Sequence, residues 1–311
     1  MGSMAIRPRA LVRGDTVGIV TLGSPLARET IDARIAYLRQ MGLDVVIGRH
    51  VYDADGYLAG TDEERADDLM AMFADERVRL ILPTRGGTGV EGILPHLDYA
   101  YIRDHPKIVS GYSDITVLLN ALAQLSGLVA LHSLLLIDFK PDTPAYNFEQ
   151  FFAGTSSLVV PRPIANPPGM PIRPLVPGIV EGPLAGGNLT SITGSLGTPY
   201  EIDTRSKILL LEETHEPVNT VYRYVEQLKL AGKLADCAGI VMGGCHECPD
   251  AYGKTYDDLI REVLVPLGKP LVSGFASGHD VYKAAVPIGA NARLDAGGGT
   301  LTLLEPAVSV V

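Results

Sequence analysis

Cysteine, tryptophan and long apolar runs are scarce or missing in this chain of 311 residues. The three cysteines, Cys237, Cys245 and Cys248, are too few for a disulfide framework in a chain of this length, which favours free thiols and a reducing compartment. No apolar run reaches the ~18 residues that a membrane helix needs. The first residues, Met1 to Met4, lack the apolar core of a secretory signal. We therefore expect neither a membrane protein nor a secreted, disulfide-rich one.

An excess of positive charge is also missing. The 26 Lys and Arg residues are outnumbered by 36 Asp and Glu residues, which gives a net charge of −10 and argues against a nucleic-acid partner. The 46% hydrophobic and 20% charged residues are ordinary for a soluble folded protein and exclude a disordered chain. The length suits two domains or one large α/β domain.

Apolar runs and amphipathic segments alternate through the first half of the chain. The runs are typical of short buried strands, and the segments between them have helical spacing. Thr61 and Glu64 fit a capping box at the start of one such helix. Strands separated by helices imply right-handed crossovers, so we predict an α/β class with a mostly parallel, Rossmann-like sheet flanked by helices in residues 1–155. The predicted strands are 16–22, 44–48, 79–84, 107–111 and 128–131, and the predicted helices are 28–41, 61–73 and 115–125.

The pattern changes at a proline-rich segment. Eight prolines lie between Pro161 and Pro183, a density that excludes a helix. We interpret residues 156–183 as an ordered but irregular connector. Residues 184–311 are predicted to form a smaller C-terminal α/β domain with mixed short strands. In the second half of the chain, the predicted strands are 178–181, 208–211, 239–242, 270–274, 286–288 and 300–304, and the predicted helices are 217–230 and 256–265.

The strongest local signal is Ser113, which lies where a predicted strand runs directly into a predicted helix. A serine at such a turn exposes its hydroxyl near the free N–H groups of the first helical turn. The match to G-x-S-x-G is incomplete because Ile115 occupies the fifth position. The turn is therefore consistent with a nucleophile whose oxyanion is bound by the Asp114 N–H, or with an ordinary helix cap.

A serine nucleophile requires a base and a carboxylate that orients it. His279 lies in a glycine-flanked loop that can present its ring to a cleft or leave it in solvent. Glu212 and Glu213 end an apolar strand on opposite faces, so only one can reach such a cleft, unless both are solvated. His132 follows the strand after the nucleophile helix and either lines the same cleft or lies behind it.

Two further motifs have little specificity of their own. The turn Arg85-Gly86-Gly87-Thr88-Gly89 follows a predicted strand and could bind an anion through its N–H groups, but it is neither a P-loop nor a dinucleotide fingerprint. Cys245 and Cys248 form a single C-x-x-C without a second pair. We therefore expect free thiols there, no metal and no cofactor.

Taken together, these segments resemble the LD-carboxypeptidase family of serine peptidases, which also contains the microcin C self-immunity peptidases. The order and spacing of the matching segments, rather than any one motif, carry the resemblance, and they extend nearly from end to end. They are residues 13–17, 85–89, 94–99, 106–116, 186–189, 197–200, 208–212, 239–243 and 278–289.

The resemblance implies a catalytic triad shared by the two domains. Ser113 would be the nucleophile, His279 the general base and then acid, and Glu212 the carboxylate that orients it. The backbone N–H groups of Gly86 and Asp114 would form the oxyanion hole. As candidate substrate contacts we add Arg85, Gly87, Tyr112 and His132. Among them, Arg85 has a planar guanidinium that suits a substrate carboxylate, unless it forms a structural ion pair.

The family hydrolyses an L,D-peptide bond and releases a terminal D-amino acid from muropeptides during cell-wall recycling. Its members are typically cytoplasmic homodimers without a metal, and we expect the same here, with a small peptide as substrate. Thr88 stands where the family commonly has an aromatic residue, so the resemblance does not predict the substrate pocket in detail. Arg85 favours the carboxypeptidase branch of the family over the immunity branch.

Three other readings remain open. The nearest is an immunity-type peptidase that cleaves an aminoacyl- or peptidyl-adenylate conjugate with the same triad. A second is an α/β-hydrolase esterase, which would place its nucleophile and histidine on one continuous sheet. The third, of another class, is a non-catalytic ligand-binding protein with two lobes.

Overall fold

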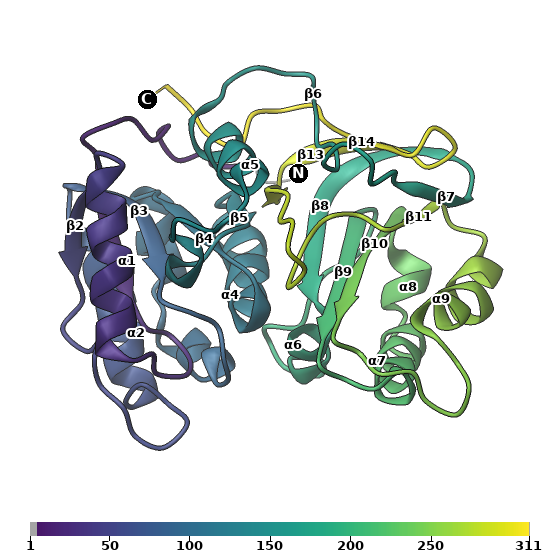
Figure 1. The fold of residues 1–311 in the computed structure, drawn as a ribbon, viewed down its shortest axis with the longest axis horizontal. Helices are drawn as coiled ribbons and strands as arrows, with labels where there is room; N and C mark the ends of the chain where they lie inside the picture. Colours follow the sequence, from purple (N-terminus) through teal and green to yellow (C-terminus); the bar gives the residue numbers. More distant parts are fainter. Residues whose placement is uncertain (1–4, 311) are drawn as a thin grey trace.

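The fold consists of two β-sheets that lie side by side, with helices packed against them (Figure 1). The computed structural model describes residues 5–310, and within this range the sheets have six and eight strands. The Met1–Met4 segment, considered above for a secretory signal, lies outside the described residues. The mixed α/β class expected from the sequence is confirmed.

The first sheet is mostly parallel, as the alternation of strands and helices predicts. Its strand order is β12-β5-β4-β3-β1-β2, and the pairs among β1 to β5 are all parallel. The strands β1 to β5 span Thr16–Val20, Asp44–Ile47, Val78–Pro83, Ile108–Gly111 and Ala130–His132. The α-helices of this half are α1 (Arg28–Gln40), α2 (Asp62–Ala74), α3 (Tyr99–Asp104), α4 (Thr116–Ala121) and α5 (Ala145–Ser156). Shorter helical turns span Val90–His96, Ser113–Ile115, Leu122–Ser126 and Leu136–Asp138.

Helix α2 shows how the local sequence sets an element. The Thr61 Oγ1 atom accepts a hydrogen bond from the Glu64 N–H (3.2 Å), and the Glu64 carboxylate accepts one from the Thr61 N–H (2.9 Å). The predicted capping box is therefore present. The inner face of the helix buries Ala66, Leu69 and Phe73, so the helix covers the sheet beside the strand that leads to the glycine turn.

One strand of the first sheet comes from near the end of the chain. β12 spans Val286–Ile288 and pairs antiparallel with β5, with Val286 opposite His132. The strand predicted at 286–288 forms, but it joins the first sheet and not the second, as its place in the C-terminal half had suggested. The chain therefore crosses back between the sheets, and the loop that contains His279 makes this crossing.

The second sheet has a parallel centre with antiparallel strands on both sides. Its order is β6-β14-β13-β8-β9-β10-β11-β7, with β8 to β11 parallel. The strands are β6 (Arg162–Pro163), β7 (Arg173–Val176), β8 (Ile179–Asn188), β9 (Ile208–Thr214), β10 (Gly239–His246), β11 (Leu271–Ser273), β13 (Asn291–Asp295) and β14 (Thr300–Leu303). The helices are α6 (Leu189–Gly194), α7 (Val218–Leu230), α8 (Lys233–Asp236) and α9 (Tyr256–Leu259), with turns at Ile260–Leu264 and Val265–Leu267.

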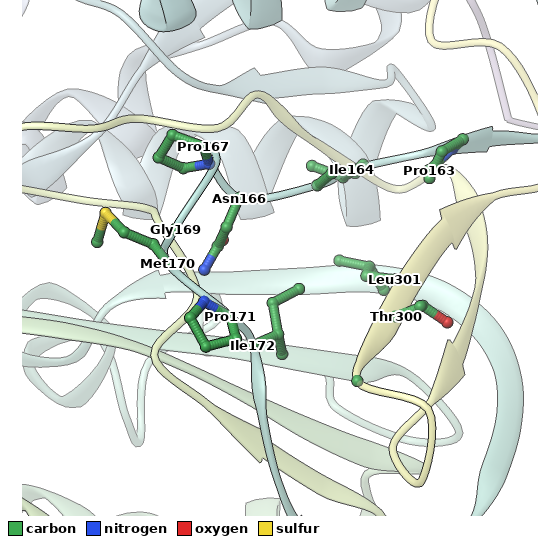
Figure 2. A pocket seen from close by; sticks show the side chains of 12 residues that line it. Pro163, Ile164, Asn166, Pro167, Gly169, Met170, Pro171, Ile172, Thr300 and Leu301 are labelled. Atoms are coloured by element: carbon green, nitrogen blue, oxygen red, sulfur yellow. The ribbon is translucent and has the colours of Figure 1, made fainter.

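The proline-rich segment supplies both edge strands of the second sheet, β6 and β7. Proline has no N–H to donate to a neighbouring strand, so edges are where a sheet tolerates it. Between these strands, the segment lines a pocket of about 370 Å³ together with Thr300 and Leu301 (Figure 2). Residues 157–183 of the predicted connector thus contain no helix in the described structure, but they contribute strands to the second sheet and are less irregular than expected.

One apolar cluster spans both sheets, and each sheet has a further cluster of its own. The shared cluster contains Leu118 of α4 and Val286 of β12 on the side of the first sheet, together with Leu184 and Leu210 of the second sheet, all buried. Polar contacts at its border also join the halves, because the Asn120 Nδ2 atom donates to the Gly186 carbonyl (3.0 Å). The carboxyl ends of β4 and β9 are therefore held beside each other by packing as well as by hydrogen bonds.

Among residues 5–310, no helix combines the length and the apolar character that crossing a bilayer requires.

Candidate active site

Ser113 occupies a backbone conformation that few side-chain-bearing residues adopt. Its φ angle is +63°, in the left-handed region, directly after β4. A non-glycine residue in this region is strained, and such strain concentrates at functional sites. The turn predicted from the sequence is therefore present, and it turns the Ser113 side chain away from the strand path.

Gly86 lies against this serine. A Cβ atom placed on Gly86 would be 2.9 Å from Ser113 Oγ and 2.9 Å from the Asp114 nitrogen, closer than real side chains allow. Only glycine lets the two backbone segments approach this closely. The structure thus brings together the three residues that the sequence assigned to a nucleophile and its oxyanion hole.

The glycine turn is fixed by buried charged side chains. The fully buried Arg65 guanidinium donates to the carbonyls of Leu22 and Gly89, the latter at 2.8 Å. The Asp114 carboxylate accepts from the Val90 N–H (2.9 Å) through Oδ2. Burial raises the pKa of Asp114, while these hydrogen bonds oppose that shift.

The Asp114 carboxylate also reaches the second half of the molecule. Its Oδ1 atom accepts from the Ser191 hydroxyl of α6 (3.1 Å). The same carboxylate thereby connects the glycine turn, the start of the nucleophile helix and the second sheet.

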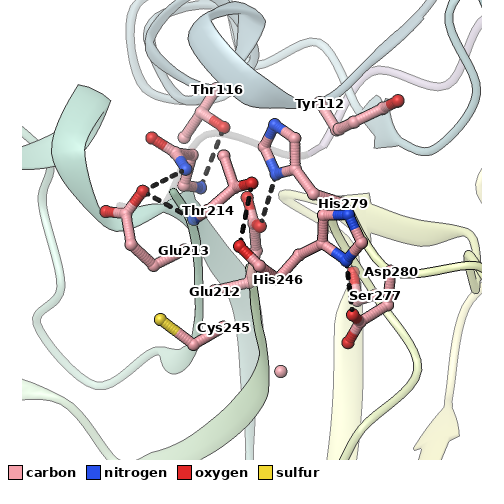
Figure 3. Close-up of polar contacts among 12 residues, drawn as sticks. Tyr112, Thr116, Glu212, Glu213, Thr214, Cys245, His246, Ser277, His279 and Asp280 are labelled. Carbon is pink, nitrogen blue, oxygen red and sulfur yellow. Dashed lines mark hydrogen bonds and ion pairs between the residues drawn. The ribbon is translucent and has the colours of Figure 1, made fainter. Parts of the chain in front are cut away.

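His279 and Glu212 form a hydrogen-bonded pair. The His279 Nδ1 atom is 2.9 Å from Glu212 Oε2, and the Glu212 side chain has no exposed surface (Figure 3). Because an ionised carboxylate only accepts, Nδ1 carries the proton and Nε2 is left as the basic nitrogen. Gly278 makes the contact possible, since a Cβ at this residue would lie 2.1 Å from Glu212 Oε2.

Glu213 faces the other way along β9, as strand alternation predicts. Its carboxylate accepts hydrogen bonds from Asn188 Nδ2 (3.2 Å) and from the N–H (2.8 Å) and hydroxyl (2.7 Å) of Thr190. Both glutamates are buried, so the alternative of two solvated charges is wrong. Glu212 is the one that pairs with the histidine.

Tyr112 packs on the other side of His279. The two rings meet edge to face, with centroids 5.0 Å apart. The Tyr112 hydroxyl donates to Asp138 Oδ1 (3.4 Å), and the Lys283 ammonium lies 3.9 Å from the same carboxylate. Sequence reasoning missed Asp138 and Lys283, because neither belongs to a motif and they are far apart in the chain.

A pocket of about 300 Å³ collects most of the predicted site residues. Its lining residues are Arg85, Gly86, Gly87, Tyr112, Ser113, Leu135, Ile137, Thr214, His215 and His279. His132, a candidate substrate contact in the sequence, is buried and is not part of this lining. The sequence analysis did not single out Thr214 or His215, which follow Glu212 and Glu213 directly and reach the pocket from the end of β9.

The prediction of free thiols at Cys245 and Cys248 is wrong, because the two residues form a disulfide. Their Cα atoms are 5.5 Å apart at the end of β10, within the usual range for such a bond. Cys237 is a free, buried cysteine. The cysteine pattern therefore no longer supports a reducing compartment.

The disulfide loop supports the pocket wall. The carbonyl of His246, between the two cysteines, accepts from the His215 N–H (2.9 Å) and from the Thr214 hydroxyl (3.2 Å). Within the described part of the chain, no group of three or more His, Cys, Asp or Glu side chains is placed to hold a metal ion.

The site also excludes one of the open readings, the α/β-hydrolase esterase. Ser113 follows β4 of the first sheet, whereas His279 lies in the loop after β11 of the second sheet and pairs with Glu212 of β9. The α/β-hydrolase reading requires the nucleophile and the histidine on one continuous sheet, so that reading is excluded.

Comparisons with known proteins agree with this architecture. Residues 17–133 match the LD-carboxypeptidase N-terminal domain and residues 181–294 match the LD-carboxypeptidase C-terminal domain. A probable murein peptide carboxypeptidase of Bacillus subtilis is 38% identical, over 99% of this chain and 97% of that protein.

Two solved structures show the same fold. Microcin C7 self-immunity protein MccF in complex with aspartyl sulfamoyl adenosine superposes with a TM-score of 0.90, at 26% identity, over 98% of this chain and 100% of that one. Muramoyltetrapeptide carboxypeptidase from Oxalobacter formigenes gives a TM-score of 0.81, at 27% identity, over 92% and 98% of the two chains. The chain belongs to the LD-carboxypeptidase family and is a serine-type carboxypeptidase.

Proposed function

We propose that this protein hydrolyses the L,D-peptide bond before the terminal D-amino acid of a muropeptide, with Ser113, His279 and Glu212 as its triad. The observation that carries the proposal is the pairing of His279 with the buried Glu212 in a pocket that Ser113 also lines. This is the order of groups that activates a serine: a carboxylate orients an imidazole, and the imidazole accepts the hydroxyl proton.

In the proposed reaction, the basic Nε2 of His279 accepts the Ser113 proton as Oγ attacks the scissile carbonyl. The backbone N–H groups of Gly86 and Asp114 stabilise the oxyanion, and each such donor contributes about 3 kcal/mol in comparable hydrolases. His279 then protonates the leaving amino group. A water molecule, deprotonated by His279, hydrolyses the acyl-enzyme and restores Ser113.

Arg85 gives the pocket its preference for a chain end. It is the one Lys or Arg residue among the described residues that line this pocket. A guanidinium binds a carboxylate through two parallel hydrogen bonds, which an internal peptide bond cannot offer. We therefore assign Arg85 to the terminal carboxylate of the substrate, with Gly87 and Tyr112 as further contacts.

Release of the terminal residue tests this proposal. The purified protein is incubated with the murein tetrapeptide that ends in D-alanine, and the free alanine of either configuration is measured. The same peptide ending in L-alanine is the control substrate, and the Ser113→Ala protein is the control enzyme. The proposal expects D-alanine from the first peptide with the wild-type protein alone. Equal release from both peptides, or release by Ser113→Ala, would contradict it.

A second function is favoured by one specific observation, the close superposition on MccF bound to aspartyl sulfamoyl adenosine. The same triad would then hydrolyse an aminoacyl- or peptidyl-adenylate conjugate. A side-by-side assay of a hydrolysable aspartyl-adenylate conjugate and the murein tetrapeptide separates the two functions by their kcat/KM values. Arg85 favours the muropeptide as substrate, because the muropeptide has a terminal carboxylate next to the scissile bond for the guanidinium to bind and an adenylate conjugate does not.

We also propose a cytoplasmic homodimer, as the family resemblance implies. One chain has a mass of 33.1 kDa. Light scattering after gel filtration measures the mass in solution directly, and a monomeric mass would overturn the dimer without affecting the triad. Localisation is tested by fractionating the source cells and probing the soluble and envelope fractions.

A further inference from the structure

Two buried polar atoms next to the triad have no hydrogen-bond partner among residues 5–310: Glu212 Oε1 and His132 Nε2. The other Glu212 oxygen accepts from His279. Buried polar atoms in proteins are paired as a rule, with protein or with ordered water, and a carboxylate oxygen without a donor is especially costly. Both atoms therefore call for a partner.

The two side chains are neighbours, because the same two backbone segments touch both of them. In the second sheet, Gly187 and Asn188 pair with Leu211 and Glu212. A Cβ on Gly187 would lie 2.9 Å from His132 Cδ2, the ring carbon bonded to Nε2. The His132 ring thus lies against Gly187, next to Asn188, whose backbone pairs with Glu212.

The His279 loop gives the second pair of contacts. The Ser277 Oγ atom is 3.3 Å from His132 Nδ1, and the adjacent Gly278 leaves room for the Glu212 carboxylate. The imidazole of His132 and the carboxylate of Glu212 are therefore enclosed by the same strand on one side and the same loop on the other.

The unpartnered atoms are complementary in hydrogen bonding. Ser277 is fully buried, and its Oγ atom lies 3.3 Å from His132 Nδ1. When the Ser277 hydroxyl donates in this contact, the proton of the neutral His132 ring resides on Nε2. Burial lowers the pKa of His132 to about 4, which keeps the ring neutral at neutral pH, although the nearby Glu212 opposes this shift. His132 Nε2 is then a donor without an acceptor, beside Glu212 Oε1, an acceptor without a donor.

Thr116 supplies a third polar group at the same place. Its Oγ1 atom accepts from the Asn188 N–H (3.0 Å), which leaves the hydroxyl proton available. A Cβ on Gly187 would lie 2.6 Å from this oxygen, so Thr116 and the His132 ring border the same point of the strand. A buried water requires two to four polar partners, and this site offers three.

We propose that His132, Thr116 and Glu212 bind one buried water molecule, and that His132 acts through this water as a positioning residue for the triad. The water accepts hydrogen bonds from His132 Nε2–H and from the Thr116 hydroxyl, and it donates to Glu212 Oε1. With both oxygens bonded, the carboxylate is held in the orientation that presents Oε2 to His279. This role rests on the proposed function, but the water site itself does not.

Paired substitutions separate this role from simple packing. His132→Asn keeps a polar group near Ser277 but cannot reach the water, whereas the longer side chain of His132→Gln places an N–H where Nε2 stood. We expect kcat to fall roughly 10- to 100-fold in His132→Asn, the size of a lost hydrogen bond to a charged group, with KM unchanged. His132→Gln should recover most of that loss. Ser133→Ala, a buried neighbour whose hydroxyl also has no partner among the described residues, is the matched control and should retain wild-type kcat.

The tautomer of His132 gives a readout that does not depend on any substrate. In protein labelled with ¹⁵N-histidine, a two-dimensional ¹H–¹⁵N spectrum identifies the protonated ring nitrogen, and the His132→Gln protein assigns the signal. The proposal expects a neutral ring with its proton on Nε2 between pH 6 and 8, and a mixture of tautomers in Ser277→Ala. A proton on Nδ1, a charged ring, or equal kcat losses in His132→Asn and His132→Gln would overturn it. If instead the tautomer is as expected and no D-alanine is released, the proposed function fails and the water site stands.

Discussion

The Nδ1 atom of His279 lies 2.9 Å from Glu212 Oε2, although 67 positions separate the two residues in the chain. Glu212 lies on β9 of the second sheet, and His279 lies in the loop that leads to β12 of the first. The segment that crosses between the sheets therefore places His279 near the first sheet, where Ser113 follows β4. This arrangement is the structural basis for the predictions that follow.

Gly86→Ala should impair catalysis without unfolding the protein. The added methyl group would meet Ser113 and the Asp114 nitrogen below 3.0 Å, so the glycine turn must move away from the oxyanion position. We expect kcat to fall about 100-fold or more, as when an oxyanion donor is lost. Gly297→Ala is the matched control, because its new Cβ would have no neighbour closer than 3.6 Å. Equal kcat values in the two variants, measured by D-alanine release, would show that the turn does not contact the reacting centre.

Arg85→Ala should weaken substrate binding more than it slows chemistry. Loss of a two-pronged bond to the terminal carboxylate is expected to raise KM roughly tenfold or more, with a smaller change in kcat. Arg293→Ala, which removes an exposed arginine paired with Glu181, controls for the loss of a positive charge. Steady-state kinetics on the tetrapeptide decide the matter, and unchanged KM and kcat in Arg85→Ala would exclude the carboxylate role.

Thiol titration checks the correction at Cys245 and Cys248. The native protein should show no reactive thiol, because these two residues are disulfide-bonded and burial raises the pKa of Cys237 to about 11. After denaturation without a reductant, one thiol per chain should react with a chromogenic disulfide. Three thiols per chain under that condition would show that the disulfide does not form.

The contribution of His132 to the stability of the protein should fall as the pH drops from 7 to 5. Burial lowers the pKa of His132 from 6.5 to about 4 in the folded chain, so the unfolded chain takes up a proton in this interval and the folded chain does not. This residue alone should cost about 2 kcal/mol of unfolding free energy between the two pH values. Urea unfolding of wild type and His132→Gln at both pH values measures the difference. A pH dependence that is the same in both proteins would contradict the neutral, buried state of His132.

Local patterns in the sequence predicted much of the fold. The capping box at Thr61 and Glu64, the apolar run that becomes β9 and the strand-to-helix turn at Ser113 each depend on residues close together in the chain. These features set the α/β class and the mostly parallel first sheet. The alternation along β9 also predicted that Glu212 and Glu213 face opposite sides, and Glu212 is the one that contacts His279.

Features that depend on distant contacts could not be predicted in this way. Residues 286–288 carry the pattern of a strand, but nothing in them indicates that β12 pairs with β5 of the other sheet. The position of Asp138 and Lys283 around Tyr112 depends on the same crossing. The disulfide was missed because a C-x-x-C spacing is equally compatible with two thiols, and the return of the chain at the end of β10 decides between them.

Site-mapped labelling with a fluorophosphonate probe tests the central claim most directly. The reagent phosphonylates a serine only where a base activates the hydroxyl, and mass spectrometry of the digested protein identifies the modified residue. The account predicts one modified residue, Ser113, and a labelling rate that falls by a factor of roughly 1000 or more in His279→Ala. Labelling of another serine, no labelling at all, or a rate unaffected by His279→Ala would contradict a Ser113–His279–Glu212 triad.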